Sequence, residues 1–482
     1  MNRNLKILKI NANKKELGTA TILKKLQKKL SPAQIVVLSF LLIITIGGVL
    51  LSFPISHTGD VAVSVTDAFF TSISAVCVTG LVTLTTASTW SFFGKLVILF
   101  LIQLGGLSLV TVLTFFMVNI GKKLSLKTRL SIQTTLNKPS LGGAVHMVML
   151  VIKGTLVFEL VGALLLFAFF LSQGIIWHKA LFYGIFHSVS AFCNGSFDVI
   201  GERSLIPYSG NFGINIVIML LIVAGGIGFT VWEDVFTKIK SNLSRQMKQR
   251  GDFSLHTKLA LVSTGVLLLS GTLFFLATEY NNPKTLGNYS FTHKLLASLF
   301  QSVTLRTAGF STIAQEGLTE ASKLFSSLYM IIGGSPGGTA GGIKTVTLAI
   351  VLCSVWSIIR GRKKIVVFER TISVITLQKA LAVVVLMISL LLAGTTILAI
   401  TEDHTIFPHS ISDLIFEVSS ALGTVGLSTG ITPFLSEIGK YVLMLCMFIG
   451  RIGPITLIIS LLHNSQTGSE VIGYPNEDVM IG

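Results

Sequence analysis

Long apolar stretches recur along the chain and alternate with shorter ones. Runs such as Ile35 to Phe53 and Leu381 to Ile400 contain roughly 20 mainly apolar residues, enough for a helix to cross a ~30 Å hydrocarbon layer. Several of these runs are followed by an apolar segment of about a dozen residues, which is too short to span a bilayer. The alternation predicts helices that cross a membrane, with half-helices between them that enter it and return.

A glycine-containing tetrad occurs four times at near-equal intervals, with its third residue at positions 80, 196, 309 and 426. The tetrads are Val78-Thr79-Gly80-Leu81, Asn194-Gly195-Ser196-Phe197, Thr307-Ala308-Gly309-Phe310 and Thr424-Val425-Gly426-Leu427. So regular a spacing predicts four copies of one structural unit.

Each tetrad has the same neighbours on both sides. Before it come a long span, a polar connection and a short helical stretch; these half-helices are predicted at Thr66 to Val76, Lys179 to Phe192, Phe291 to Val303 and Ser412 to Leu422. Small polar residues, Thr66 or Asp67 and Ser412 or Asp413, are placed to cap two of them. After each tetrad a second long span follows, with a glycine pair or its remnant near the middle, at Gly105-Gly106, Gly225-Gly226, Gly333-Gly334 and Gly450.

We therefore predict an all-α membrane protein of four tandem M1-P-M2 (helix, pore loop, helix) repeats. Non-helical backbone at membrane depth must be buried in protein or line a watery cavity, so four such loops are expected to face one central pore with pseudo-fourfold symmetry. Eight transmembrane helices and four half-helices follow. The predicted division is a basic N-terminal segment 1–32, repeats at 33–120, 121–240, 255–358 and 376–463, and a C-terminal tail 464–482.

Composition and charge agree with this interpretation. Hydrophobic residues make up 51% of the chain and charged residues 12%, and the net charge of +16 resides in connections between spans rather than on an aromatic-studded face, which argues against nucleic acid. Basic clusters before the first span, at Lys122 to Arg129, at Lys238 to Arg250 and at Arg360 to Arg370 alternate with connections poor in Lys and Arg, which predicts cytoplasmic termini. The four cysteines lack CxxC spacing, so neither a disulfide framework nor a metal site is expected.

The tetrads suit a cation pathway. Rings of backbone carbonyls can replace the hydration shell of an ion, and glycine at the third position permits the dihedral angles that turn successive carbonyls toward an axis. Thr79, Thr307 and Thr424 could add hydroxyl support. The half-helices would direct their partially negative C-terminal ends toward the pathway, which favours a cation over an anion.

Four longer motifs resemble the Ktr/Trk/HKT superfamily of potassium transporters, and most of all its KtrB-type membrane subunits. They are Cys77 to Leu81, Thr304 to Phe310, the glycine-rich run Gly333 to Thr345 and Gly450-Arg451-Ile452-Gly453-Pro454, and the resemblance covers about residues 33 to 462. It implies a potassium uptake system of the bacterial cell membrane, in which this chain forms a homodimer and binds a cytosolic RCK-type nucleotide-binding subunit. The permeant ion would be K⁺, and no organic cofactor is expected on this chain.

The resemblance also assigns a selectivity filter, with ion-facing carbonyls from the first two residues of each tetrad. The expected ion-binding residues are Val78, Thr79, Gly80, Asn194, Gly195, Ser196, Thr307, Ala308, Gly309, Thr424, Val425 and Gly426. One departure stands out, because Ser196 occupies a position where the family has glycine. In plant relatives a serine at a filter glycine accompanies sodium permeability, so a Na⁺-permeable or K⁺/Na⁺ transporter is the alternative.

A gate is predicted beneath the filter. Residues 333 to 345 interrupt an apolar span with glycines and a proline and cannot stay helical. They resemble the intramembrane gating loop of the family; the predicted gate residues are Gly333, Gly334, Ser335, Pro336, Gly337, Gly338, Thr339, Ala340, Gly341, Gly342, Lys344 and Arg451. A phosphate-binding loop is disfavoured because Ile343 separates Gly342 from Lys344. Arg451 would either form a barrier to cations or tie repeats together through carbonyl contacts or an ion pair.

The other buried charged residues have structural explanations, and other classes of function have weaker support from the sequence. Glu159 could pair with Lys153, and Glu417 is expected to hydrogen-bond neighbouring loop backbone. No paired nucleophile and base, metal cluster or nucleotide fingerprint supports an enzyme. An alternating-access cation carrier remains an alternative, although it predicts inverted repeats whereas these four repeats all run in the same direction.

Overall fold

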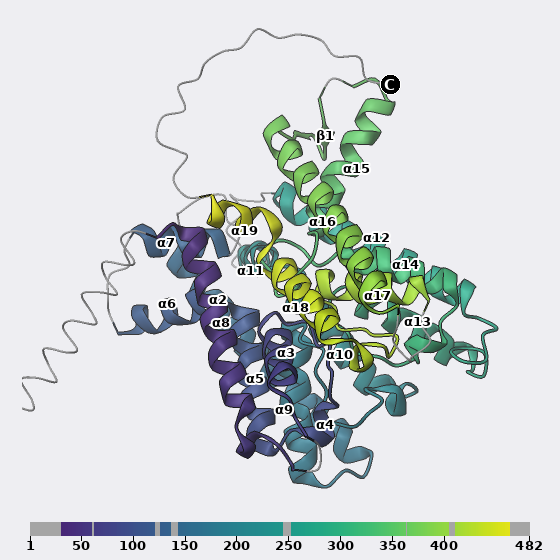
Figure 1. Ribbon diagram of the computed structural model, residues 1–482. Helices are drawn as coiled ribbons and strands as arrows, with labels where there is room; N and C mark the ends of the chain where they lie inside the picture. The colour runs from purple at the N-terminus through teal and green to yellow at the C-terminus, as the bar shows by residue number, and fades with distance from the viewer. Residues whose placement is uncertain are drawn as a thin grey trace, which may run out of the picture.

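The computed structural model describes residues 30–59, 62–120, 126–135, 143–243, 252–362, 364–403 and 410–462. Most of the predicted N-terminal segment, the C-terminal tail and the basic residues Lys122, Arg245 and Arg250 lie outside these ranges. In Figure 1 the purple and blue helices of the first repeat lie beside the green helices of the third and fourth repeats, with the yellow helix α18 (Glu437–Ile452) of the fourth repeat between them.

The first span of each repeat is a long continuous helix. These helices are α2 (Pro32–Ser52), α8 (Ala144–Ser172), α12 (Leu255–Thr278) and α16 (Val374–Thr401), and all four are long and apolar enough to cross a membrane. Ser31, Ser254 and Ser373 cap three of them by accepting a hydrogen bond from the third amide of the helix. Helix α16 begins just before the predicted start of the fourth repeat at 376.

The predicted half-helices are present as α3 (Val65–Val76), α9 (Trp177–Cys193), α13 (Phe291–Thr304) and α17 (Ile411–Gly423). The N-caps of α3 and α17 are Ser64 and Ser410, whose hydroxyls accept from the amides of Asp67 and Asp413. Of the predicted capping residues, Asp413 takes part in capping, since its carboxylate accepts the Ser410 amide at 3.0 Å. Serine reaches these amides because it lies three residues before them.

The second spans are broken in every repeat, whereas a break was predicted only for the third. Helix α5 (Phe92–Leu107) meets α6 (Leu109–Asn119) at 85°, α10 (Phe212–Gly226) meets α11 (Phe229–Leu243) at 99°, and α18 meets α19 (Pro454–Leu461) at 94°. In the third repeat, residues 332–344 separate α14 (Glu320–Ile331) from α15 (Thr345–Ile359). Positive φ angles at Ser108, Gly228 and Gly453 end the helical path at the three bends.

The glycines near these breaks allow close packing. A Cβ added to Gly105, Gly225 or Gly450 would overlap a backbone carbonyl oxygen near the end of the half-helix of the same repeat, at Val76, Phe192 and Leu422 respectively. Glycine is therefore required because the second span lies directly against the carbonyl end of the half-helix. The sequence pattern located these glycines but not this reason for them.

Several short elements complete the fold. They are α4 (Thr86–Thr89), α7 (Leu126–Thr135), the 3₁₀ turns η1 (Pro54–Ser56), η2 (Ile206–Tyr208), η3 (Gln315–Gly317) and η4 (Thr432–Phe434), and the strands β1 (Val366–Val367) and β2 (Arg370–Thr371). The strands pair antiparallel, Val366 with Thr371 and Val367 with Arg370, in the connection between α15 and α16. This hairpin of two-residue strands is a local addition to the helical fold that was predicted.

Buried carboxylates join the two spans of the third and fourth repeats. Glu279 follows α12 and accepts hydrogen bonds from the amide and hydroxyl of Thr319, at 3.0 and 2.8 Å. Glu402 follows α16 and receives the amide and hydroxyl of Ser436 in the same way, at 3.0 and 2.6 Å. Because Thr319 and Ser436 are the N-caps of α14 and α18, each glutamate fixes the start of a second span.

Ion pairs join neighbouring repeats at the end of the molecule where the half-helices begin. Lys440 of α18 contacts Asp67 of α3 at 3.1 Å, which links the last repeat to the first. Lys323 of α14 contacts Asp413 of α17 at 3.0 Å, which links the third repeat to the fourth. The side chains of Lys440 and Asp67 are 12% and 11% exposed, so water screens this pair less than a surface pair.

We predict that Lys440→Met lowers the free energy of unfolding by about 1–3 kcal/mol, because Asp67 keeps its charge in a partly buried position without its cation. Heat unfolding of the detergent-solubilised protein measures the effect. Asp252→Asn is the matched control, since the Lys258–Asp252 pair is 28% and 78% exposed and its loss should leave stability nearly unchanged. Equal effects of the two substitutions would show that the pair does not hold the repeats together.

Candidate ion pathway

The four tetrads share an unusual backbone conformation. Their first residues have positive φ angles, 56° at Val78, 60° at Asn194, 67° at Thr307 and 52° at Thr424, and their third residues also do, 86° at Gly80, 63° at Ser196, 70° at Gly309 and 94° at Gly426. The second residues have negative φ angles. Such alternation turns successive carbonyls to the same side of the strand. Ser196 has the positive φ angle that was expected for the third residue of a tetrad, where the other three repeats have glycine.

Three first residues, Val78, Thr307 and Thr424, are β-branched and strongly disfavour positive φ. A conformation of this kind costs roughly 1–3 kcal/mol per residue and persists only where the surroundings impose it. Here the half-helix imposes it through backbone bonds: the amides of Thr79, Gly195 and Val425 each return to the carbonyl of a residue five positions earlier.

The tetrads converge at the level of their second and third residues. The Ser196 hydroxyl lies 2.5 Å from the carbonyl oxygens of both Ala308 and Val425, in the third and fourth repeats. A Cβ on Gly80 would overlap the Ser196 side chain, and one on Gly426 would overlap the Thr79 carbonyl oxygen. Segments from all four repeats therefore meet around one point, which the hydroxyl oxygen of Ser196 occupies. We call this the convergence point.

Buried hydroxyls near the end of each half-helix anchor the tetrads, and sequence reasoning missed them. Ser74 and Ser420 accept the amides of Gly80 and Gly426, each at 3.0 Å. Ser190 and Thr304 donate to the carbonyl oxygens of Phe197 and Phe310, at 2.8 and 2.7 Å. The signal available in the sequence was a serine or threonine three or four residues before each tetrad, at Ser74, Ser190, Thr304 and Ser420. Thr307 accepts from the Asn194 side-chain amide at 3.3 Å, and among the described residues the Thr79 and Thr424 hydroxyls have no hydrogen-bond partner. Support of a cation by these three hydroxyls stays a prediction.

Two buried glutamates brace the surroundings of the tetrads. Glu417 accepts hydrogen bonds from the Thr429 amide at 2.9 Å and from the hydroxyls of Ser428 and Thr432, as expected for a residue that holds loop backbone. Glu159 accepts from the Gln103 amide at 3.1 Å, and the Cys193 thiol lies 3.7 Å from it, beside the second tetrad. The expected Lys153–Glu159 pairing is replaced by these contacts.

The glycine-rich segment lies directly against the tetrads. A Cβ on Gly341 would overlap the Thr424 side chain, and one on Gly333 would contact Thr307 at 3.4 Å. Its backbone bonds to the bend of the second repeat, with the amides of Ser335 and Thr339 donating to Gly226 and Gly225 at 2.8 and 3.1 Å. The glycine-rich segment therefore lies next to the first residues of the third and fourth tetrads and covers the convergence point from that side.

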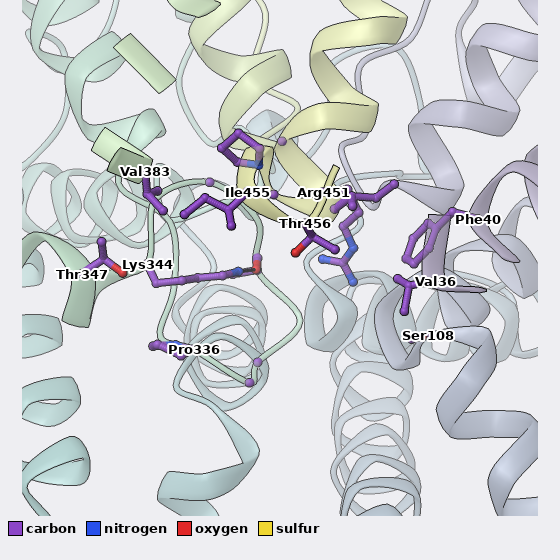
Figure 2. A pocket seen from close by; sticks show the side chains of 18 of the residues that line it. Val36, Phe40, Ser108, Pro336, Lys344, Thr347, Val383, Arg451, Ile455 and Thr456 are labelled. Carbon is purple, nitrogen blue, oxygen red and sulfur yellow. Dashed lines mark hydrogen bonds between the residues drawn. The ribbon is translucent and has the colours of Figure 1, made fainter. Parts of the chain in front are cut away.

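The Arg451 side chain extends across this region from α18 (Figure 2). Its guanidinium donates to the carbonyl oxygen of Gly105 at 2.6 Å and to that of Thr339, which belong to the first and third repeats. Of the two alternatives for Arg451, the tie between repeats through carbonyl contacts is present. Lys344 donates to the Ala340 carbonyl at 2.5 Å within the same segment.

Within the part of the chain that the structure describes, no group of three or more His, Cys, Asp and Glu side chains could hold a metal ion, and the four cysteines are free. Fold and site together define a multi-pass helical membrane protein in which four strained backbone segments meet at one point.

Comparison with known proteins identifies the family. A family model described as TrkH, cation transport protein, matches residues 27–469. The chain is 40% identical over 455 residues to the Ktr system potassium uptake protein B of Bacillus subtilis, covering 94% of this chain and 97% of that one. It is 38% identical over 464 residues to the potassium/sodium uptake protein NtpJ of Enterococcus hirae, covering 96% and 100%. The structure of the potassium transporter TrkH from Vibrio parahaemolyticus matches with a TM-score of 0.68 at 19% identity, covering 89% of this chain and 84% of that one.

The chain therefore belongs to the TrkH/Ktr family of cation transport proteins. The family resemblance, the helical membrane fold and the expectation of a transporter rather than an enzyme are confirmed.

We predict that Ser420→Ala and Ser74→Ala each lower the free energy of unfolding by about 1–3 kcal/mol, because the buried amide of Gly426 or Gly80 loses its acceptor. Heat unfolding in detergent measures this. Ser389→Ala removes an exposed helical hydroxyl and should leave stability within about 0.5 kcal/mol. A Ser420→Ala protein as stable as this control would contradict the anchoring role.

Proposed function

We propose that this chain is the ion-conducting subunit of a potassium uptake system and that the first three residues of each tetrad form its selectivity filter. The observation that carries the proposal is the approach of one oxygen atom, Ser196 Oγ, to two carbonyls from different repeats at 2.5 Å each. Carbonyls gathered at such a distance around one atom can coordinate a dehydrated monovalent cation. The potassium uptake named for the Bacillus subtilis relative supports the choice of ion.

Ser196 tunes the choice of ion. In the conformation described, its hydroxyl lies among the carbonyls that would bind the ion and hydrogen-bonds to two of them. Passage of K⁺ requires this hydroxyl to rotate aside or to act as a ligand itself. A Na⁺-permeable protein is the second candidate function, and the name of the Enterococcus hirae relative, a potassium/sodium uptake protein, favours keeping it.

We predict that Ser196→Gly raises the K⁺ to Na⁺ permeability ratio about tenfold, a change of about 1.4 kcal/mol in the difference between the two barriers. Removing the side chain frees the Ala308 and Val425 carbonyls for the larger ion. Bi-ionic flux in proteoliposomes, with Ser389→Ala as control, measures the ratio. Unchanged discrimination would remove Ser196 from the selectivity mechanism.

The segment 333–345 and Arg451 form the gate of this pathway. Arg451 carries a fixed positive charge and holds the carbonyls of the first and third repeats together next to the filter. A cation moving along the axis meets this charge, so conduction requires the guanidinium to withdraw and the segment to move with it. The passive channel-like mechanism is distinguished from an alternating-access carrier by rubidium flux under an imposed diffusion potential, since a carrier would require a counter-ion gradient.

We predict that Arg451→Ala raises the passive K⁺ leak about tenfold in the absence of any partner, because the barrier falls by about 1.4 kcal/mol when the charge and its ties are removed. Flux through proteoliposomes measures the leak. Arg360→Ala, at the exposed end of α15, should leave it unchanged. Flux that stays the same or falls in Arg451→Ala would exclude this gate.

We also propose where this subunit lies in the cell and what it binds. The subunit lies in the bacterial cell membrane with both termini in the cytoplasm, as the distribution of Lys and Arg predicts. It forms a homodimer and docks a cytosolic RCK-type subunit that binds a nucleotide, in accord with the multi-component system named for the Bacillus subtilis relative.

A further inference from the structure

A large cavity lies beside the bends of the second spans. Its volume is about 880 Å³. Its walls come from the bend of α5 and α6, the segment Pro336 to Lys344 and the bend of α18 and α19, with helices α2, α15 and α16 around them (Figure 2). Gln133 of α7 and Phe229 of α11 also line it, so all four repeats contribute to the cavity, which contains both Lys344 and Arg451.

The side chains that line this cavity give it a net positive charge. Lys344, Lys379 and Arg451 line it, and among the described residues that line it none is acidic. Among the described residues, Lys344 and Arg451 donate hydrogen bonds to backbone carbonyl groups, which carry no net charge. Positive groups in a membrane interior without a counter-charge are costly, so the cavity favours a bound anion.

Three helices begin at the wall of the cavity and add to this preference. Helix α6 follows Ser108, α15 follows Lys344 and α19 follows Gly453, and these three residues all line the cavity. The first amides of a helix lack partners within it, and its N-terminal end is partially positive. Phosphate groups bind at such ends in many proteins.

An unpaired hydroxyl gives a second, independent indication. Ser108 is 5% exposed, lines the cavity and occupies the N-cap position of α6 without making a capping bond. Its hydroxyl has no hydrogen-bond partner. A buried polar group in this state is rare and calls for a ligand, and a hydroxyl beside ammonium groups suits an oxygen of an oxyanion.

We infer that this cavity binds a phosphate-type oxyanion held by Lys344, Lys379 and Ser108, and favoured by the partially positive N-terminal ends of α6, α15 and α19. Donors contributed to one cavity by several different elements suit an anion with three or four acceptor oxygens better than chloride. The same chemistry is offered by inorganic phosphate and by the headgroup of an anionic phospholipid. The inference goes beyond ion conduction, since it concerns an anion bound beside the proposed gate residues Lys344 and Arg451, and it holds whether or not the tetrads select potassium.

Binding is tested on the full chain in neutral detergent. Sodium phosphate is expected to raise the midpoint of heat unfolding in a saturable way, whereas sodium chloride at equal ionic strength does not. Lys379→Gln and Ser108→Ala should each weaken the apparent affinity for phosphate about tenfold. Lys284→Gln, which removes an exposed lysine far from the cavity lining, is the matched control and should bind as the unaltered protein does.

A second arm separates the two sources of the anion. Vesicles or mixed micelles that contain phosphatidylglycerol replace phosphate, and phosphatidylcholine serves as the reference lipid. Stabilisation by phosphatidylglycerol alone, reduced in Lys379→Gln, assigns the site to a lipid headgroup, and stabilisation by phosphate assigns it to the free ion. The inference is overturned if neither stabilises the protein, or if Lys284→Gln loses the effect as fully as Lys379→Gln.

Discussion

The structure depends on one constraint: peptide groups that leave helical geometry inside a bilayer must find partners within the protein. Each tetrad meets this constraint in the same way, with amides returned to the half-helix and a buried hydroxyl such as Ser74 or Ser420 taking one more group. The carbonyls on the inner side are left for whatever occupies the convergence point. In this fold the need to satisfy backbone groups and the ability to bind a bare cation arise from the same geometry.

The broken second spans follow from that arrangement. Glycines such as Gly105 and Gly225 bring these helices against the carbonyl ends of the half-helices, and the chain then turns aside at Ser108 and Gly228. Every turn starts a new helix, so partially positive N-terminal ends collect beneath the tetrads while the half-helices direct partially negative ends toward them. The pathway thus joins a region that attracts cations to one that repels them.

Much of this architecture could be predicted from the sequence, because repeated spacing and apolar length are properties of the chain itself. The half-helices and the place of Ser196 in its tetrad follow from that information. The positive φ at Val78 and Thr424 could not be foreseen, since β-branched residues disfavour it and only tertiary contacts impose it.

The bends at Ser108 and Gly453 escaped prediction for a different reason, which is that isolated glycines are tolerated in apolar helices. The cationic cavity was hidden as well, because residues from Val36 to Thr456 line it and no local pattern records that they meet.

Ser196 and Arg451 present obstacles of different physical kinds. A hydroxyl among carbonyls is neutral, so its effect depends on the size and hydration of each ion and changes which ion passes. A guanidinium bound to carbonyls acts through its charge, which is the same toward all monovalent cations and decides whether any of them passes. Arg451 lines the cavity and is held by neutral carbonyl acceptors, so a bound anion there would compete with these carbonyls for its guanidinium. In the proposed pathway, selection among ions and control of their passage can therefore vary independently, since different atoms and different forces carry them.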